Sequence, residues 1–314
     1  MRQAGRYLPE YRELRGDYTF REAISTPEVA EEISLQPWER FHPDGVVMYS
    51  DILTALEPLG VEYRIESGVG PVIEDPIESI DDVNHPPARV DASLDYVGAL
   101  LERLNDRLAG ETAVIGFVGG PFTLLAYAVE GRPARSFMGP RRLRYSDPDT
   151  FTSLLEILGD LLGSIIDYQV DHGADVIQLF DTYAGLLTDA DYREYLLPVH
   201  RDILSGVDAP TIMYARNMGG RLDLLRESGA DVVGVDWTVG IASVRRSLGD
   251  IPVQGNLDPA ALYGAPEDVQ KRTEAIIEAA GASGHILNLG HGVDKHTPPE
   301  NVRAFFEAAQ SFER

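Results

Sequence analysis

Short apolar runs recur along the chain, and nearly every run ends in a polar or glycine-rich turn. Seven of them are rich in Val and Ile and lack alternating polar positions: Gly45–Ser50, Ala113–Gly120, Asp175–Phe180, Thr211–Ala215, Asp231–Val235, Ile251–Gln254 and His285–Leu289. Continuous runs of this kind are typical of strands that are buried on both faces. The pattern therefore predicts seven strands of a parallel sheet.

Amphipathic stretches with helical spacing lie between most of these runs. The clearest are Pro27–Phe41 after the N-cap candidate Thr26, Asp149–His172, Glu267–Ala280, and Asn301–Gln310 after a capping-box sequence from Thr297 to Glu300. Alternation of strands and helices predicts right-handed crossover connections and an α/β fold.

The polar residues at the ends of the runs favour a barrel over a doubly wound sheet. They form the clusters Ser50-Asp51, Gly119-Gly120-Pro121, Asp181-Thr182-Tyr183, Arg216-Asn217, Asp236-Trp237, Asn256-Leu257-Asp258 and Gly290-His291-Gly292. A (β/α)8 TIM barrel uses the carboxyl ends of all its strands, whereas a doubly wound sheet uses one switch point. We expect a single barrel domain over residues 1–314, with one strand unaccounted for.

Two further segments interrupt this alternation. In the first, the stretch Val61–Arg64 and residues Val72–Ile73 predict a hairpin at the start of the long excursion Glu66–Pro87. The second, Arg132–Tyr145, contains five Arg and shows no helical period. Its composition fits either a mobile flap beside a site or a solvated loop.

Composition limits the classes of function. The 51 acidic and 27 basic residues give a net charge of −24, which disfavours partners such as nucleic acid and anionic membranes. The charge fits an ordinary acidic protein or one adapted to molar salt, where charge repulsion is screened. Cys is absent, which excludes disulfides and thiolate chemistry. Because we see neither a signal peptide nor a membrane-spanning run, we expect a cytoplasmic protein.

Several residues could carry chemistry. Arg2, Arg6, Arg12 and Arg15 reverse the sign of the charge locally and suggest an anion-binding loop, or else a solvated terminus. Asp51 could cap the following helix or face the barrel mouth. In the segment Gly116–Tyr127, a Gly-Pro turn leads into a helix that carries Tyr127, without a phosphate-loop pattern. His291, between two glycines, fits a phosphate site at Gly290–Gly292 better than a metal site.

Taken together, these motifs resemble the uroporphyrinogen decarboxylase family. The opening MRQAGRYLPEYR resembles the family's first signature, and GFVGGPFTLLAY followed by Glu130-Gly131 resembles its second. The stretches SDILTALEPLG, LFDTYAGLL, MYARNMGG, VDWTV, VQGNLDP and ILNLGHGVDKHTPPENV follow in the expected order. The resemblance covers essentially the whole chain.

The resemblance implies a cofactor-free and metal-free enzyme, usually a homodimer, that converts the four acetate arms of uroporphyrinogen III to methyl groups and yields coproporphyrinogen III. It implies catalytic roles for Asp51, Arg2 and Tyr127. Asp51 would accept hydrogen bonds from the pyrrole N–H groups, and Arg2, or a water that Arg2 polarises, would donate a proton. Substrate binding would involve Arg2, Gln3, Ala4, Arg6, Arg15, Asp51, Tyr127, Phe180, Thr182 and His291.

Two departures from the family pattern stand out. Family members carry a segment before the first signature that includes most of the first strand, which would explain seven runs in place of eight. Thr182 stands where Ser is frequent and keeps the hydroxyl. Three alternatives to this function are a zinc-dependent methyltransferase, which the absence of Cys disfavours, a phosphate-handling barrel enzyme, and a tetrapyrrole-binding protein without turnover.

Overall fold

The computed structural model describes residues 5–66, 68–281 and 283–312. Its strands are β1 (Gly45–Val47), β2 (Tyr63–Glu66), β3 (Gly70–Ile73), β4 (Ala113–Gly119), β5 (Val176–Phe180), β6 (Thr211–Tyr214), β7 (Val232–Gly234), β8 (Val253–Leu257) and β9 (His285–Leu289). All seven predicted runs are strands, and the predicted hairpin is the antiparallel pair β2 and β3.

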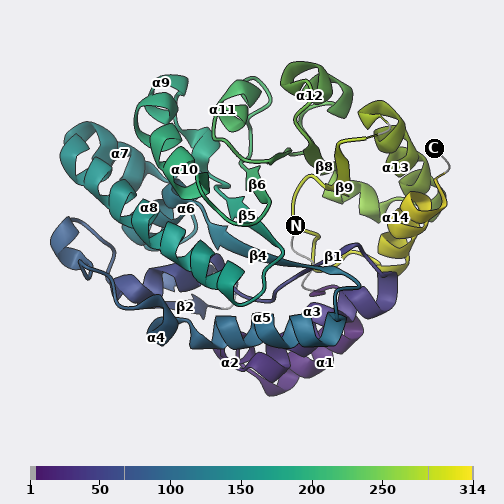
Figure 1. Ribbon diagram of the computed structural model, residues 1–314, viewed down its shortest axis with the longest axis horizontal. Coiled ribbons are helices and arrows are strands. Elements are labelled where there is room, and N and C mark those ends of the chain that lie inside the picture. The colour runs from purple at the N-terminus through teal and green to yellow at the C-terminus, as the bar shows by residue number, and fades with distance from the viewer. Residues whose placement is uncertain (1–4, 67, 282, 313–314) are drawn as a thin grey trace.

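The helices surround the strands (Figure 1). They are α1 (Pro9–Asp17), α2 (Phe20–Ser25), α3 (Pro27–Phe41), α4 (Val90–Ser93), α5 (Asp95–Leu108), α6 (Pro121–Glu130), α7 (Met138–Ser146), α8 (Pro148–Asp171), α9 (Asp189–Asp191), α10 (Leu197–Leu204), α11 (Leu222–Arg226), α12 (Ile241–Leu248), α13 (Pro266–Ala280) and α14 (Pro299–Ser311). Short 3-10 helices are η1 (Ile52–Leu59), η2 (Ile80–Asp82), η3 (Ala184–Leu186) and η5 (Pro259–Tyr263), and η4 (Tyr192–Leu196) is a π-helical turn.

Seven strands form one curled, all-parallel sheet in the order β1-β4-β5-β6-β7-β8-β9, and the predicted TIM-barrel class is confirmed. Within the described residues no strand pairing joins β1 to β9, so the barrel is open between them. A cavity of about 590 Å³ lies along this opening, lined among others by Gly45 of β1, Leu287 of β9 and Phe305 of α14. An eighth strand would have to lie between β1 and β9 to close the barrel.

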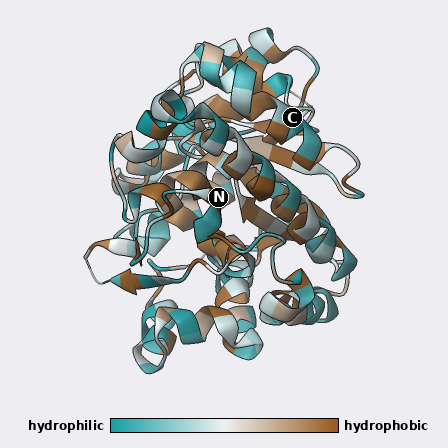
Figure 2. Ribbon diagram, turned by 90° about the vertical axis from the view of Figure 1, so that its left-hand side faces the viewer, coloured by the Kyte–Doolittle hydropathy of each residue, from teal (hydrophilic) through white to brown (hydrophobic). Residues whose placement is uncertain are grey.

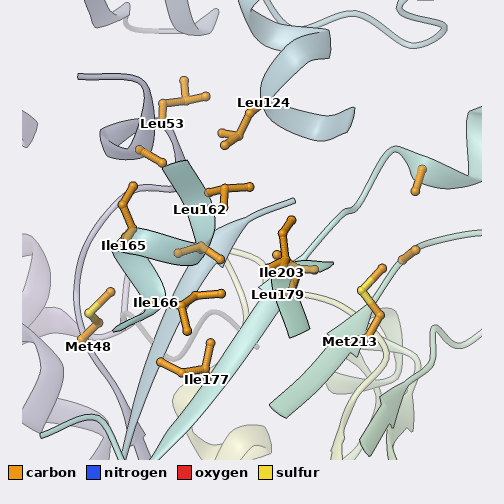
Figure 3. Close-up of a cluster of buried hydrophobic side chains, with 14 of the residues drawn as sticks. Met48, Leu53, Leu124, Leu162, Ile165, Ile166, Ile177, Leu179, Ile203 and Met213 are labelled. Carbon is orange, nitrogen blue, oxygen red and sulfur yellow. The ribbon is translucent and has the colours of Figure 1, made fainter. Parts of the chain in front are cut away.

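Alternation along each strand separates an outer core from the barrel interior. Ile177 and Leu179 of β5 point outward and pack with Leu162 and Ile166 of α8 in the apolar cluster of Figure 3. The alternate residue Val176 lines the interior cavity, and Phe180 has the same parity at the upper end of the strand. Figure 2 accordingly shows apolar strands inside and polar segments outside.

Most predicted helices agree with the structure to within a residue or two, but their caps differ. The predicted capping box is wrong, because α14 begins after Pro298 and has no side-chain cap. Thr26 is the N-cap residue of α3, yet its side chain makes no capping bond. A proline at or next to the first helical position has no N–H to be capped, which reduces the need for such a side chain.

The segment Arg132–Tyr145 also differs from the prediction. Its second half is helix α7, so a solvated loop is wrong for that half, whereas a flap beside the site stays a prediction. An ion pair of 2.6 Å between Arg144 and Asp191 ties α7 to α9, and Arg144 also lies over the ring of Tyr195. Tertiary contacts therefore stabilise a helix that the local sequence pattern does not indicate. Among the described helices, none is both long and apolar enough to cross a membrane.

Candidate functional site

The candidate residues follow the carboxyl ends of parallel strands, and these ends meet at one mouth of the barrel. Asp51 follows β1, Thr182 follows β5, and His291 follows β9. Tyr127 comes from α6, the helix that follows β4. The structure thus brings together residues that are up to 240 positions apart, from 51 to 291 in the chain.

Asp51 caps the first turn of η1. Its Oδ1 accepts a hydrogen bond of 2.8 Å from the backbone N–H of Leu53. The side chain is half-buried, and its charge contributes, after burial itself, to raising the pKa of Tyr63 well above the usual value. The capping interpretation is therefore confirmed. The second interpretation, an acceptor for a bound ligand, stays a prediction.

Arg6 lies where the two open edges of the barrel face each other. Burial raises the pKa of Tyr49, which follows β1, while the guanidinium groups of Arg15 and then Arg6 oppose this effect. The hydroxyl of Tyr263 holds the pKa of Asp294 below its usual range, and Arg6 adds a smaller contribution. Arg6 is therefore within electrostatic reach of the residues that follow both edge strands. Arg2, Gln3 and Ala4 lie outside the described residues.

The N-terminal segment is anchored across this opening. The Arg12 side chain donates a hydrogen bond of 2.9 Å to the carbonyl oxygen of Lys295, and the hydroxyls of Tyr11 and Tyr49 are 3.2 Å apart. Arg15 bonds the carbonyl oxygen of Tyr18 and lies 5.8 Å from the ring centre of Phe20. A frayed terminus is thus wrong for Arg12, which is exposed but bonded across the opening, whereas the contacts of Arg15 are local.

Tyr127 belongs to an aromatic group beside the mouth. Its ring meets those of Phe137 and Tyr183 edge-on, with centroids 5.3 and 5.9 Å away, and its hydroxyl is 3.5 Å from the Tyr183 hydroxyl. The helix α6 that carries it starts very close to β5, since a Cβ at Gly120 would lie 2.2 Å from the Cβ of Asp181. Glycine at this position therefore permits the approach.

Sequence reasoning gave no role to a buried polar chain beneath these residues. Asp181, fully buried between Phe180 and Thr182, accepts hydrogen bonds from the N–H and hydroxyl of Thr123 at 2.8 and 2.7 Å. It also bonds Nε2 of His200 at 2.8 Å, and Nδ1 of His200 lies 3.0 Å from the Tyr192 hydroxyl.

Burial, followed by the charge of Asp181, raises the pKa of Tyr192 far above its usual value, so the hydroxyl keeps its proton. All polar groups of this hydrogen-bonded series have partners when the Tyr192 hydroxyl donates to Nδ1 of His200 and Nε2 of His200 donates to Asp181. It fixes the end of β5 against the first turn of α6, and so fixes Thr182 relative to Tyr127. The sequence feature that could have pointed to this role is the position of Asp181 between the candidate residues Phe180 and Thr182.

Aromatic rings line the inner wall of the mouth. Phe117 meets Phe180 at 5.8 Å, Phe180 meets Tyr214 at 6.1 Å, and Tyr214 stacks on His291 at 6.0 Å with an interplanar angle of 10°. The Tyr214 hydroxyl donates a 2.8 Å hydrogen bond to the carbonyl oxygen of Gly290 and so pins the loop that carries His291. Two predicted residues, Phe180 and His291, are thus joined through Tyr214, which sequence reasoning missed.

Asp51 and His291 line different cavities. His291 and Tyr7 line the cavity of about 590 Å³, whereas Asp51 and Phe117 border a recess of about 10 Å³. The recess is no larger than a water molecule requires. A single substrate cavity shared by all the predicted residues therefore stays a prediction. Within the described residues, neither His291 nor any other side chain belongs to a group of three residues that could bind a metal ion.

Comparison with known proteins places the sequence in a family. The family model described as "Uroporphyrinogen decarboxylase (URO-D)" matches residues 1–312. A uroporphyrinogen decarboxylase from Crocosphaera subtropica is 42% identical over 322 residues, covering 100% of this chain and 91% of that relative. Another from Gloeobacter violaceus is 44% identical over 318 residues, covering 99% of this chain and 92% of the relative.

The similarity to solved structures supports the fold of this chain and nothing beyond it. A methyltransferase from Methanosarcina mazei superposes with a TM-score of 0.83 at 19% identity, covering 95% of this chain and 90% of that one. A B12-independent methionine synthase from Shewanella sp. gives a TM-score of 0.61 at 13% identity, over 93% of this chain and 88% of that one. Identity this low carries no functional argument, whereas the sequence relatives match over nearly their full length. The chain belongs to the uroporphyrinogen decarboxylase family.

Proposed function

We propose that this protein is a carboxy-lyase that removes CO2 from the four acetate side chains of uroporphyrinogen III and releases coproporphyrinogen III. The observation that carries the proposal is family membership across residues 1–312. The placement of acidic, basic and aromatic candidates around one barrel mouth supports it, because such mouths are where barrel enzymes act.

The chemistry follows from the substrate. A proton adds to the pyrrole ring carbon beside an acetate arm and creates an electron-poor iminium. The C–C bond to the carboxylate then breaks, CO2 leaves, and the electron pair moves into the ring. Protonation of the resulting exocyclic methylene gives the methyl group, and loss of the ring proton restores the pyrrole. The substrate thus acts as its own electron sink.

The protein must stabilise the charges of this reaction. Asp51 is the fixed anion proposed to face the cationic ring through the pyrrole N–H groups. Arg2, or a water that Arg2 polarises, is the proposed proton donor, while Tyr127 and Thr182 are proposed to contact the reacting acetate. Because a general acid contributes only about 10²–10⁴-fold, orientation and electrostatics have to supply most of the acceleration.

Incubation with uroporphyrinogen III tests the proposal. We expect CO2 release and the successive appearance of porphyrinogens with seven, six, five and four carboxylates. Tight binding without CO2 release would instead support a tetrapyrrole-binding protein without turnover. Phosphate binding at Gly290–Gly292 together with an inert porphyrinogen would support a phosphate-handling enzyme.

Replacement of Arg6 by Ala should weaken substrate binding. Arg6 lies between the residues after β1 and β9, and its planar guanidinium suits bidentate binding of a carboxylate arm. We expect KM to rise about tenfold, since a charge-assisted hydrogen bond is lost. Steady-state kinetics measure the change, and an unchanged KM would argue against a carboxylate clamp.

Chelators should leave the rate unchanged. The proposed reaction draws its electron sink from the substrate, and the sequence contains no Cys for a zinc-activated thiol. Rates measured before and after dialysis against EDTA provide the test. A loss of activity that added zinc restores would favour the methyltransferase-like alternative.

The remaining expectations concern assembly and habitat. We propose one barrel domain that assembles as a cytoplasmic homodimer with facing mouths, an arrangement supported by the family resemblance. The net charge of −24 supports operation in concentrated salt. Light scattering tests for the dimer, and urea unfolding at about 0.1 and 3 M salt tests the salt dependence of stability. A monomer would contradict the first point, and maximal stability at the lower salt concentration would contradict the second.

A further inference from the structure

Arg216 differs from Arg144 and Arg221 in having no ionic partner among the described residues. Arg221 bonds the carbonyl oxygens of Leu187 and Gly185, and Arg144 pairs with Asp191. In the part of the chain that the structure describes, the Nε of Arg216 is buried and has no hydrogen-bond partner. A half-buried guanidinium with unused donors is costly unless an anion binds to it.

The backbone of Arg216 is held rigidly. It follows β6, and its N–H donates a hydrogen bond of 3.3 Å to the carbonyl oxygen of Thr182. A Cβ at position 185 would lie 2.1 Å from the carbonyl oxygen of Arg216, so Gly185 permits the close contact. The next residue, Asn217, has a left-handed φ of 59° and donates its N–H to Asp236 at 2.6 Å. The loop after β6, which carries Arg216, is therefore fixed to the loop after β5, which carries the predicted substrate contact Thr182.

The side chain is also oriented. Its guanidinium carbon lies 5.5 Å from the ring centre of Trp237, which follows β7. The Trp237 ring also stacks on that of His291, with centroids 6.3 Å apart and an interplanar angle of 24°. The carboxylate of the preceding residue, Asp236, accepts hydrogen bonds from the N–H of Asn217 and from the N–H and hydroxyl of Thr238. The stack of Arg216, Trp237 and His291 thus presents a preorganised cation at the mouth.

The position in the sheet suggests what this cation binds. In the order β1-β4-β5-β6-β7-β8-β9, β6 is the middle strand, so its end lies across the mouth from the opening between β1 and β9. Arg6 occupies the side of that opening. A porphyrinogen carries carboxylate arms around its entire rim, and cations on one side alone would leave the arms on the other side without a counter-charge.

We propose that Arg216 binds a carboxylate arm of the porphyrinogen on the side of the mouth opposite Arg6, with Trp237 fixing the plane of the guanidinium. This inference rests on the proposed function. Arg216 acts as a binding residue, and it extends the basic binding surface beyond the N-terminal arginines.

The test compares R216Q and R216K with the unmodified enzyme. R216Q should raise the KM for uroporphyrinogen III about 10- to 100-fold with a smaller change in kcat, since a charge-assisted contact is lost. R216K should recover part of the loss because it keeps the charge without the planar fork. The salt dependence of KM should also become shallower in R216Q, a change that a purely structural role would not produce.

Two further variants sharpen the result. R226Q removes an exposed arginine of the neighbouring α11 and should leave KM unchanged. W237L should raise KM on its own but add little to R216Q, because Trp237 acts through Arg216. An active enzyme whose KM is unchanged in R216Q overturns the inference, whereas an unmodified protein without CO2 release overturns the proposed function itself.

Discussion

Replacement of Asp51 by Asn should lower kcat about 100- to 1,000-fold while the fold stays intact, because the reaction would lose the anion opposite its cationic ring. Asn keeps an oxygen that can accept the 2.8 Å hydrogen bond from Leu53, so the cap of η1 is retained. The measurement is the single-turnover rate of CO2 release, together with the unfolding midpoint in urea. The change removes one negative charge and little else.

Asp258 offers a matched control. It too caps a 3-10 helix after a barrel strand, with Oδ1 accepting from the N–H of Ala260 at 2.9 Å. It is exposed, and no role in the site is assigned to it. We expect Asp258→Asn to react at the normal rate. If Asp51→Asn also retains a near-normal rate, the electrostatic role of Asp51 is refuted.

Replacement of Asp181 by Ala should cost about 3–5 kcal/mol in the free energy of unfolding, since it breaks a buried charge-assisted pair. The side chains of Asp181 and His200 are both 0% exposed. Without the carboxylate, His200 Nε2 and both donors of Thr123 lose their acceptor where water cannot replace it. Urea unfolding monitored by circular dichroism measures the loss.

Asp147 makes the same kind of contacts at the surface. As the N-cap of α8 it accepts from the N–H and the hydroxyl of Thr150, at 3.1 and 2.8 Å. Because water can hydrate the Thr150 groups, Asp147→Ala should destabilise the protein much less than Asp181→Ala. Equal losses for the two variants would contradict the idea that burial makes the Asp181 chain important.

Much of the fold could be predicted from local patterns. Strands such as β4 and β7 are continuous apolar runs, and α8 carries one apolar face for its whole length. These patterns reflect burial against a sheet and are visible in any window of the sequence. Helix α7 was missed because it is stabilised by contacts of Arg144 with Asp191 and the Tyr195 ring, both of which are remote in the chain.

The order of strands and helices, the family, and the expectation that Asp51, Thr182 and His291 follow strands at one end of a barrel were all predictable from the amino-acid sequence. Three features emerged from the folded structure instead: the open edge between β1 and β9, the buried hydrogen bonds from Tyr192 through His200 to Asp181, and the stack of Arg216, Trp237 and His291. Periodicity records which face of an element is buried, whereas contacts between strand ends depend on how the whole sheet curls.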